Sequence, residues 1–285
     1  MTSFLQNYQR QPKLFIDLPS KGKWYDETVI EGGQYLQIPV FGMNAMDEIL
    51  FKTPDALFSG EATAQVIRSC IPTILDPWKL VSYDIDFILI ALRIATYTEK
   101  MNVSTRCISC SSDTESVIDL NRMLDGFTNY PTEFSFDLQN FTFHLSPITY
   151  KQYTEFSMEN YVIEREMFQV EKIEDNNQRH SEMQKLYAKS SELNLRLATT
   201  YISAVSRDDA IETNVDVIRD FVKNNDAEFY EKLRAEIKNL TERWNLPTFD
   251  IKCANTECDK TYKSRVNVDY SNFFGVRWLH SRNLI

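Results

Sequence analysis

The spacing of apolar and polar residues changes along this chain, and it predicts where strands give way to helices. Up to residue 45 the apolar runs are short. Residues 13–18 and 35–40 are typical of strands, and turns at 19–22 and at Gly32-Gly33 follow or separate them. The pattern predicts a β-rich N-terminal arm over residues 1–45.

Helical spacing begins after the arm and predicts a small helical core over residues 46–103. Ser59 is the expected cap of a helix over residues 61–71, which Pro72 ends. Asp84 and Asp86 then open a helix whose apolar residues fall on one face. We expect these two carboxylates to be solvated charges that favour the helix dipole, rather than catalytic acids.

Alternation of apolar and polar residues returns in residues 132–147 and predicts a β-hairpin. Its strands are residues 134–138 and 141–145, joined at Gln139-Asn140. The alternation places His144 on the face opposite the phenylalanines. We expect His144 to contact solvent there rather than a metal.

Residues 149–246 are predicted to be largely helical. One apolar stripe recurs every four residues and another follows the expected cap Asp226, with a polar break at residues 174–177. The first stripe comprises Leu186, Leu193, Leu197, Tyr201 and Val205, and the second Phe229, Leu233, Ile237, Leu240 and Trp244. Such stripes usually pack inside a protein, and an exposed face that binds a partner is the alternative.

Four of the five cysteines form two close pairs, with C-x2-C and C-x4-C spacing. The pairs are Cys107 with Cys110 and Cys253 with Cys258. Both spacings suit a tight turn that aims two sulfurs at one tetrahedral ion, and structural zinc commonly takes four thiolates. Strand-forming residues follow each pair, at 114–120 and at 264–270. We therefore predict a split zinc ribbon in which a structural Zn2+ joins two distant parts of the chain.

Other interpretations of the cysteines remain open. The thiols could be free and reduced, or Cys107 and Cys110 could form a redox pair, although a thioredoxin-like pair would stand at a strand-to-helix junction. Catalytic zinc is disfavoured because four sulfurs close the coordination shell. We expect the fifth cysteine, Cys70, to be a buried, small apolar residue.

Taken together, these patterns predict an α+β protein. Its parts are the β-rich arm (1–45), the helical core (46–103), the split zinc-ribbon-like unit (104–127 and 250–285), and a hairpin with a largely helical insertion (128–249).

Composition narrows the classes of function. With Lys+Arg 31 and Asp+Glu 41 the net charge is −10, so the average surface repels nucleic acid and anionic membranes. Only 7 glycines and 3 scattered histidines are present, and neither phosphate-binding loops nor catalytic motifs are apparent. No apolar run approaches the roughly 20 residues of a membrane span. We expect a cytosolic protein that is not an enzyme.

The C-terminal segment, residues 252–285, leaves nucleic-acid binding as an alternative. It carries six basic and three acidic residues together with several aromatic ones. Four thiolates would bring a bound Zn2+ to a net charge of about −2, which nearly cancels this excess. A zinc-ribbon nucleic-acid-binding adaptor in transcription or replication is therefore the second hypothesis, and it predicts salt-dependent binding.

Several motifs, taken in order, resemble those of the T-even-type bacteriophage baseplate proteins. Residues 13–25 contain an LPS-x-G-x-x-Y signature, and residues 47–50, 53–57 and 92–97 follow, leading into the first cysteine pair. The resemblance is strongest over the first 125 residues. It implies either a factor (chaperone) that assembles the baseplate hub in the host cytoplasm or a subunit of the virion tail baseplate. The implied partners are hub and tail proteins, and no catalytic site is implied.

Overall fold

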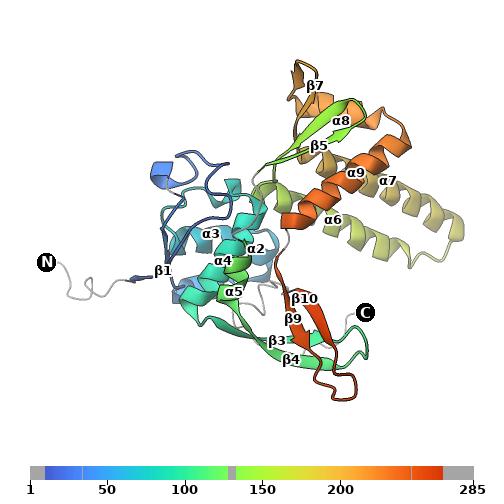
Figure 1. Ribbon diagram of the computed structural model, residues 1–285. Coiled ribbons are helices and arrows are strands. Elements are labelled where there is room, and N and C mark those ends of the chain that lie inside the picture. Colours follow the sequence, from blue (N-terminus) through green and yellow to red (C-terminus); the bar gives the residue numbers. More distant parts are fainter. Residues whose placement is uncertain (1–9, 34, 128–132, 245, 266–285) are drawn as a thin grey trace. The chain divides into compact units, whose positions relative to one another are not determined.

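The computed structural model describes residues 10–33, 35–127, 133–244 and 246–265 (Figure 1). The chain divides into two compact units, which we treat separately. The first unit comprises residues 1–130 and 245–285, and the second comprises residues 131–244. Both contain helices and small antiparallel sheets, which confirms the α+β class.

The N-terminal arm of the first unit contains a two-stranded antiparallel sheet. Strand β1 (Pro12–Ile16) pairs with β2 (Ile38–Phe41), and a 3-10 turn, η2 (Glu31–Gly33), lies between them in the chain. The expected turn at residues 19–22 is present, with Gly22 at φ 72°. A Cβ atom on Gly22 would overlap the side chain of Tyr35, so the turn needs glycine for both its backbone conformation and its close approach.

The helical part of the first unit begins with a capping box. Asn44 accepts hydrogen bonds from the amides of Met46 and Asp47, and the Asp47 carboxylate accepts one from the amide of Asn44. The helices are α1 (Ala45–Leu50), α2 (Pro54–Phe58), α3 (Glu61–Cys70), η3 (Pro77–Lys79), α4 (Ser82–Thr96) and α5 (Leu120–Gly126). Helix α4 carries more buried apolar residues than any other of these helices. They surround the helix instead of occupying the single face that the sequence predicted, because Ile85, Leu89 and Ile90 are buried as well.

The expected cap of α3 is wrong by one residue. Gly60, at φ 76°, is the N-cap, and no side chain caps the helix there. Ser59 instead donates its hydroxyl to the carbonyl oxygen of Ala56, at 3.3 Å. The left-handed conformation at Gly60 favours glycine and turns the chain between α2 and α3.

Asp84 is buried, which contradicts the expected solvated charge. It lies in the first turn of α4 with 0% of its surface exposed. Its carboxylate accepts hydrogen bonds from the amide of Ser20, at 3.1 Å, and from the hydroxyl of Tyr25, at 2.5 Å. Burial raises the pKa of Asp84 to about 6 and that of the half-buried Asp86 to about 7.

The second unit is built on a four-stranded antiparallel sheet of order β5-β6-β7-β8. The strands are β5 (Phe134–Leu138), β6 (Phe141–Leu145), β7 (Ile202–Arg207) and β8 (Ala210–Glu212). The predicted hairpin is confirmed, and Phe143, fully buried, stacks on Phe136 with ring centroids 5.3 Å apart. Helices α8 (Val215–Lys223) and α9 (Ala227–Thr241) and the short η5 (Glu242–Trp244) follow.

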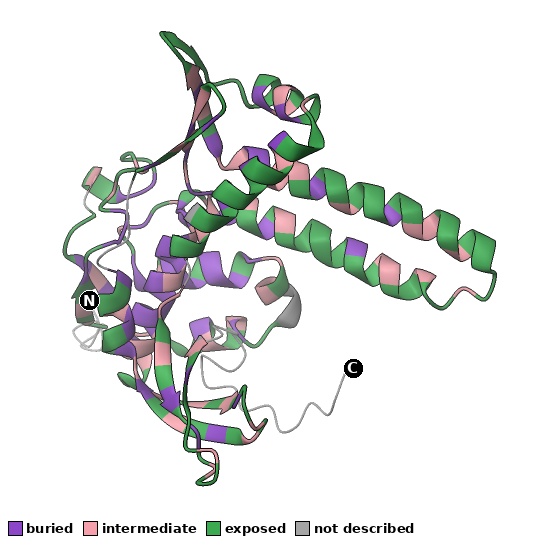
Figure 2. Cartoon of the chain, turned by 45° about the vertical axis from the view of Figure 1, so that its right-hand side comes forward, coloured by how far each residue is buried: buried purple, intermediate pink, exposed green. Residues whose placement is uncertain are grey.

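Two long helices, α6 (Tyr150–Val170) and α7 (Asn176–Thr200), connect β6 with β7. They lie side by side (Figure 2). Arg196 of α7 forms an ion pair with Glu159 of α6 at 2.9 Å. Residues 171–175 separate them, so the predicted break at 174–177 is placed about two residues too late, and Asp175 caps α7. Much of their surface is exposed. In the described part of the chain, no helix combines the length and the apolar character that crossing a membrane requires.

The predicted helical stripe is wrong after residue 200. Val205 lies in β7 and pairs with Phe143 of β6, because pairing with the β5–β6 hairpin outweighs the four-residue spacing. Leu186 and Leu193 are buried in α7 as predicted. His144 donates to or accepts from the hydroxyl of Ser206 across the strands, at 3.0 Å, rather than contacting solvent alone.

The second stripe is confirmed where the structure describes it. Asp226 accepts a hydrogen bond from the amide of Phe229, at 2.7 Å, and thereby caps α9. Phe229, Leu233 and Ile237 are buried. The side chains of Leu240 and Trp244 lie outside what the structure describes.

Candidate metal centre

Each cysteine pair lies in the loop that closes a β-hairpin of the first unit. One hairpin consists of β3 (Lys100–Arg106) and β4 (Asp113–Asp119), and the other of β9 (Thr248–Lys252) and β10 (Thr261–Arg265). In both, the first cysteine follows the first strand directly, and the second strand begins at the third residue after the second cysteine. The two segments therefore share a whole hairpin, and not only the strand that was expected after each cysteine pair.

The strands expected after the cysteines are present, with one shift. Strand β4 matches the predicted residues 114–120, whereas β10 begins at Thr261, before the predicted residues 264–270. Residues 266–270 and the Phe273-Phe274 pair lie outside the described residues. The strands that precede the cysteines, β3 and β9, were not predicted.

The two loops bring all four predicted cysteines together. Their sulfur atoms lie within 4.8 Å of one another. Cys107 Sγ is 4.0 Å from Cys258 Sγ, and Cys110 Sγ is 3.5 Å from Cys253 Sγ, so both short contacts join the two hairpins. Ligands on 2.3 Å bonds at the corners of a tetrahedron would stand about 3.8 Å apart. A disulfide needs about 2.05 Å, so these are free thiols arranged as a metal-binding set.

Backbone amides support charged sulfurs in this cluster. The residue two positions after a cysteine donates its amide to that sulfur in three cases, which are Ser112, Asn255 and Lys260. The Ser112 hydroxyl and amide lower the pKa of Cys110 to about 6. Hydrogen bonds of this kind favour the thiolate, which is the form that binds metals.

The pKa values of two other thiols in the cluster show what a bound cation would change. The Lys260 amide lowers the pKa of Cys258, but burial and the neighbouring thiols outweigh it and raise that pKa to about 11. The pKa of Cys253 is also raised, because burial and the thiols of Cys110 and Cys107 outweigh the Asn255 amide. Four negative sulfurs this close repel one another. A bound divalent cation would remove that repulsion.

Hydrogen bonds fasten the hairpins to each other around the sulfurs. The hydroxyls of Thr105 and Tyr262 lie 2.8 Å apart, and the amide of Ala254 donates to Thr114 Oγ1 at 3.2 Å. Tyr262, Ile251, Cys107 and Cys253 form a buried cluster, against which Val103, Phe249, Cys110 and Cys258 pack. Four sulfur ligands would fill a tetrahedral shell and leave no position open to a substrate.

The sequence-based analysis missed these supporting residues. Thr105, Thr114 and Tyr262 act across two segments more than a hundred positions apart, so no local motif marks them. The available signal was the symmetry of the two segments, since apolar residues alternate with polar ones before each cysteine pair as well as after it.

The fifth cysteine lies outside the cluster. Cys70 is fully buried, with its sulfur 3.6 Å from Asp47 Oδ2 and 3.8 Å from Arg10 Nη1. Burial raises the pKa of its thiol to about 12. The expectation of a buried, uncharged residue is confirmed.

Comparison with known proteins identified one matching protein family. The family described as T4 bacteriophage base plate protein matches residues 42–275, which is most of the chain. Neither a curated protein nor a solved structure matches. The matched range includes all four cysteines of the cluster.

Proposed function

The chain belongs to the T4 bacteriophage base plate protein family, and from this premise we propose that it builds the baseplate hub through protein–protein contacts, without catalysis. It acts either as a hub assembly factor or as a structural subunit of the hub. The observation that carries the proposal is the family match over residues 42–275. The proposed partners are hub and tail proteins, met in the host cytoplasm during assembly.

Exposed apolar side chains support an interaction role. Large apolar residues stand exposed on both units, and exposed apolar surface is common where proteins bind other proteins. They include Phe15, Met46, Ile49, Tyr153, Phe168, Tyr187, Ile211 and Val217.

The four clustered cysteines support a structural Zn2+. Zinc favours four thiolates in tetrahedral geometry, and such a site supplies folding energy to the segments it joins. Bound zinc would hold the β3–β4 and β9–β10 hairpins together, although 142 residues separate Cys110 from Cys253. In this proposal the ion keeps the first unit in the one conformation that its partners recognise.

Metal analysis of the purified protein tests the zinc proposal. We expect one zinc ion per chain, and none after replacement of the four clustered cysteines by serine. Cys70→Ser is the matched control and should retain the metal, because its sulfur lies outside the cluster. Equal metal content in all three proteins would contradict the assignment.

Affinity capture from phage-producing cells tests the hub proposal. The tagged protein should retain hub and tail proteins in stoichiometric amounts, identified by mass spectrometry. Its presence in purified particles would then mark a subunit, and its absence an assembly factor. Capture of polymerase subunits, or of partners lost on nuclease treatment, would contradict the hub role. The pairing of Lys252 with Asp259 at 2.7 Å already reduces the positive charge available for nucleic acid.

A further inference from the structure

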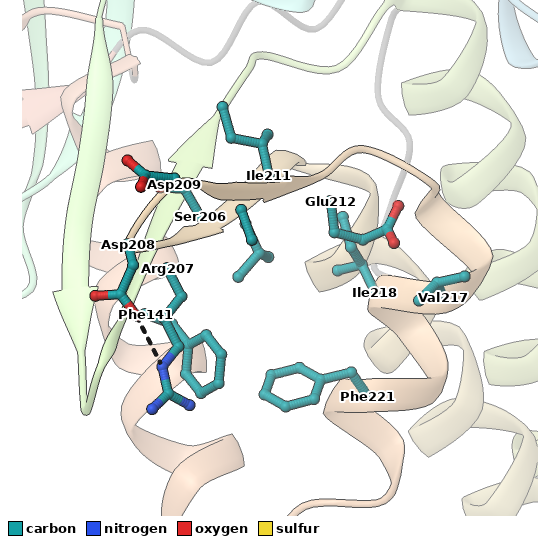
Figure 3. Close-up of a pocket in the computed structure, with 12 residues that line it drawn as sticks. Phe141, Ser206, Arg207, Asp208, Asp209, Ile211, Glu212, Val217, Ile218 and Phe221 are labelled. Atoms are coloured by element: carbon teal, nitrogen blue, oxygen red, sulfur yellow. Dashed lines mark ion pairs between the residues drawn. The ribbon is translucent and has the colours of Figure 1, made fainter.

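The second unit contains an apolar groove between the β7–β8 hairpin and α8. Its volume is about 910 Å3. The rings of Phe141 and Phe221 stand on one side with centroids 5.1 Å apart, and Val205, Ile218 and Val217 also line it (Figure 3). Val217 is 48% exposed. The groove therefore offers apolar surface to an incoming side chain.

An open sheet edge borders this groove. Strand β8 ends the sheet, and no strand in the described residues pairs with its outer side. A two-residue turn, Asp208-Asp209, joins it to β7, so Arg207 and Ala210 form the hydrogen-bonded pair next to the turn. The amide and carbonyl of the next residue, Ile211, then point away from β7. No proline, lysine or bulge protects this edge, and Ile211 is 69% exposed.

The rim of the groove is acidic. Arg207 is engaged, because its Nε lies 3.8 Å from Asp208 Oδ2 and its guanidinium lies over the Phe141 ring at 5.5 Å (Figure 3). Asp209 and Glu212 have no cationic partner within the part of the chain that the structure describes. The rim thus keeps negative charge beside the apolar surface and the open edge.

We propose that this groove docks an extended segment of a partner protein in which apolar and basic residues alternate. The segment adds a strand to β8 through the outward amide and carbonyl of Ile211. Successive side chains of a strand point to opposite sides, so its apolar residues face the groove and its basic residues lie on the side of Ile211 and Asp209 (Figure 3). Glu212 pairs with Val205 and lies on the groove side, so its charge attracts the basic residues from a longer distance. The inference rests on the proposed function, since it specifies the chemistry of one partner.

The charge on the rim decides between possible occupants. A second copy of this chain would bring the same acidic residues, Asp209 and Glu212, against each other, and like charges facing across an interface are costly. Nucleic acid is repelled for the same reason. A basic segment from another protein is the occupant that the charge favours.

Peptide binding to the full-length protein tests the inference. The probe is a fluorescent peptide of alternating lysine and valine, and its binding is followed by anisotropy at two salt concentrations. We expect saturable binding that weakens with salt, and much weaker binding of the same peptide with glutamate in place of lysine.

Variants at the edge and on the rim separate specific docking from general attraction to an acidic protein. Ile211→Pro removes the outward amide and should abolish binding, whereas Ile211→Thr keeps the amide and should bind within about threefold of wild type. Asp209→Asn with Glu212→Gln should weaken binding by about threefold to tenfold, which is the effect of losing two partly exposed charge contacts.

Equal binding by the two Ile211 variants, or no effect of the rim substitutions, would overturn the inference. The outcomes also distinguish it from the hub proposal. If the peptide fails to bind but hub proteins are captured, only the docking site is wrong. If the peptide binds as expected but no baseplate protein is captured, the hub role is wrong.

Discussion

Two residues of the N-terminal motif, Ser20 and Tyr25, have a structural role. Tyr25 Oη accepts a hydrogen bond from the amide of Val81, at 3.0 Å, and donates one to the carboxylate of Asp84. The backbone amide of the buried Ser20 donates a hydrogen bond to the same carboxylate. These bonds tie the arm to the start of α4. We therefore interpret the LPS-x-G-x-x-Y signature in this chain as a structural turn rather than as a docking element.

Replacing Asp84 should change how stability depends on pH. Its folded pKa of about 6 exceeds the ordinary Asp value, because burial penalises the charge. The contribution of this group to stability is therefore complete below about pH 4 and is lost as pH rises through 6, by up to about 3 kcal/mol. Asp84→Asn removes that loss. Denaturant unfolding should show that the wild type loses stability relative to the variant as the pH rises from 4 to 7. If the free energies of unfolding of the two proteins change equally with pH, the raised pKa of Asp84 is wrong.

Two glycines of the arm form a matched test of steric fit. Gly22 and Gly33 both have positive φ, but a Cβ atom would strike Tyr35 at Gly22 and would meet nothing within 4 Å at Gly33. Gly33→Ala should therefore cost about 1 kcal/mol through backbone strain alone, and Gly22→Ala should cost more. Thermal unfolding of both variants measures the difference, and equal losses would mean that Tyr35 moves aside freely.

The local sequence pattern gave wrong predictions of burial for residues whose surroundings come from distant segments of the chain. Asp84 occupies a first-turn position that normally favours a solvated charge, yet Ser20 and Tyr25, some sixty positions away, enclose it. The burial of Cys70 was correctly predicted, because a cysteine within an apolar stretch of sequence is usually buried, whichever distant residues contact it in the fold. Burial of an apolar group follows from its own chemistry, whereas burial of a carboxylate needs partners that spacing does not reveal.

At the level of elements, the sequence predicted which four cysteines lie together better than it predicted the strands around them. Cysteine spacing is a strong signal because two sulfurs must reach one ion from one turn. Strand β7 was taken for helix because Leu193, Leu197 and Val205 fit helical spacing. The competing signal was the Asp208-Asp209 turn after Ile202 and Val205, which marks a strand end.

The cap of α9 can be tested as an element-scale feature. Asp226 accepts the Phe229 amide at 2.7 Å, at the start of a helix whose Phe229 and Leu233 are buried. Asp226→Ala should lower the free energy of unfolding by about 1 kcal/mol, while Asp226→Asn should preserve most of it, since asparagine also caps helices well. Chemical denaturation of the two variants gives the comparison. A loss of equal size in both would assign the effect to charge instead.

For the whole molecule, the division into two units predicts how metal loss spreads. All four clustered cysteines belong to the first unit, and the second unit has its own buried residues, including Phe143, Phe229 and Leu233. Removing the proposed zinc with a chelator leaves four crowded thiols and takes away the bond between the two hairpins. The disturbance should therefore begin at the hairpins.

Hydrogen exchange followed by mass spectrometry can locate this disturbance. Chelation should strongly reduce protection in β3, β4, β9 and β10, because without the metal only a few hydrogen bonds and a small apolar cluster join these short hairpins, and should leave β5, β6 and β7 protected. Cys70→Ser, without chelator, should keep protection in all these strands. Uniform loss in both units on chelation would mean that they fold as one cooperative body. In that case the metal would stabilise the interaction surfaces of the second unit as well as the two hairpins of the first unit that carry the cysteines.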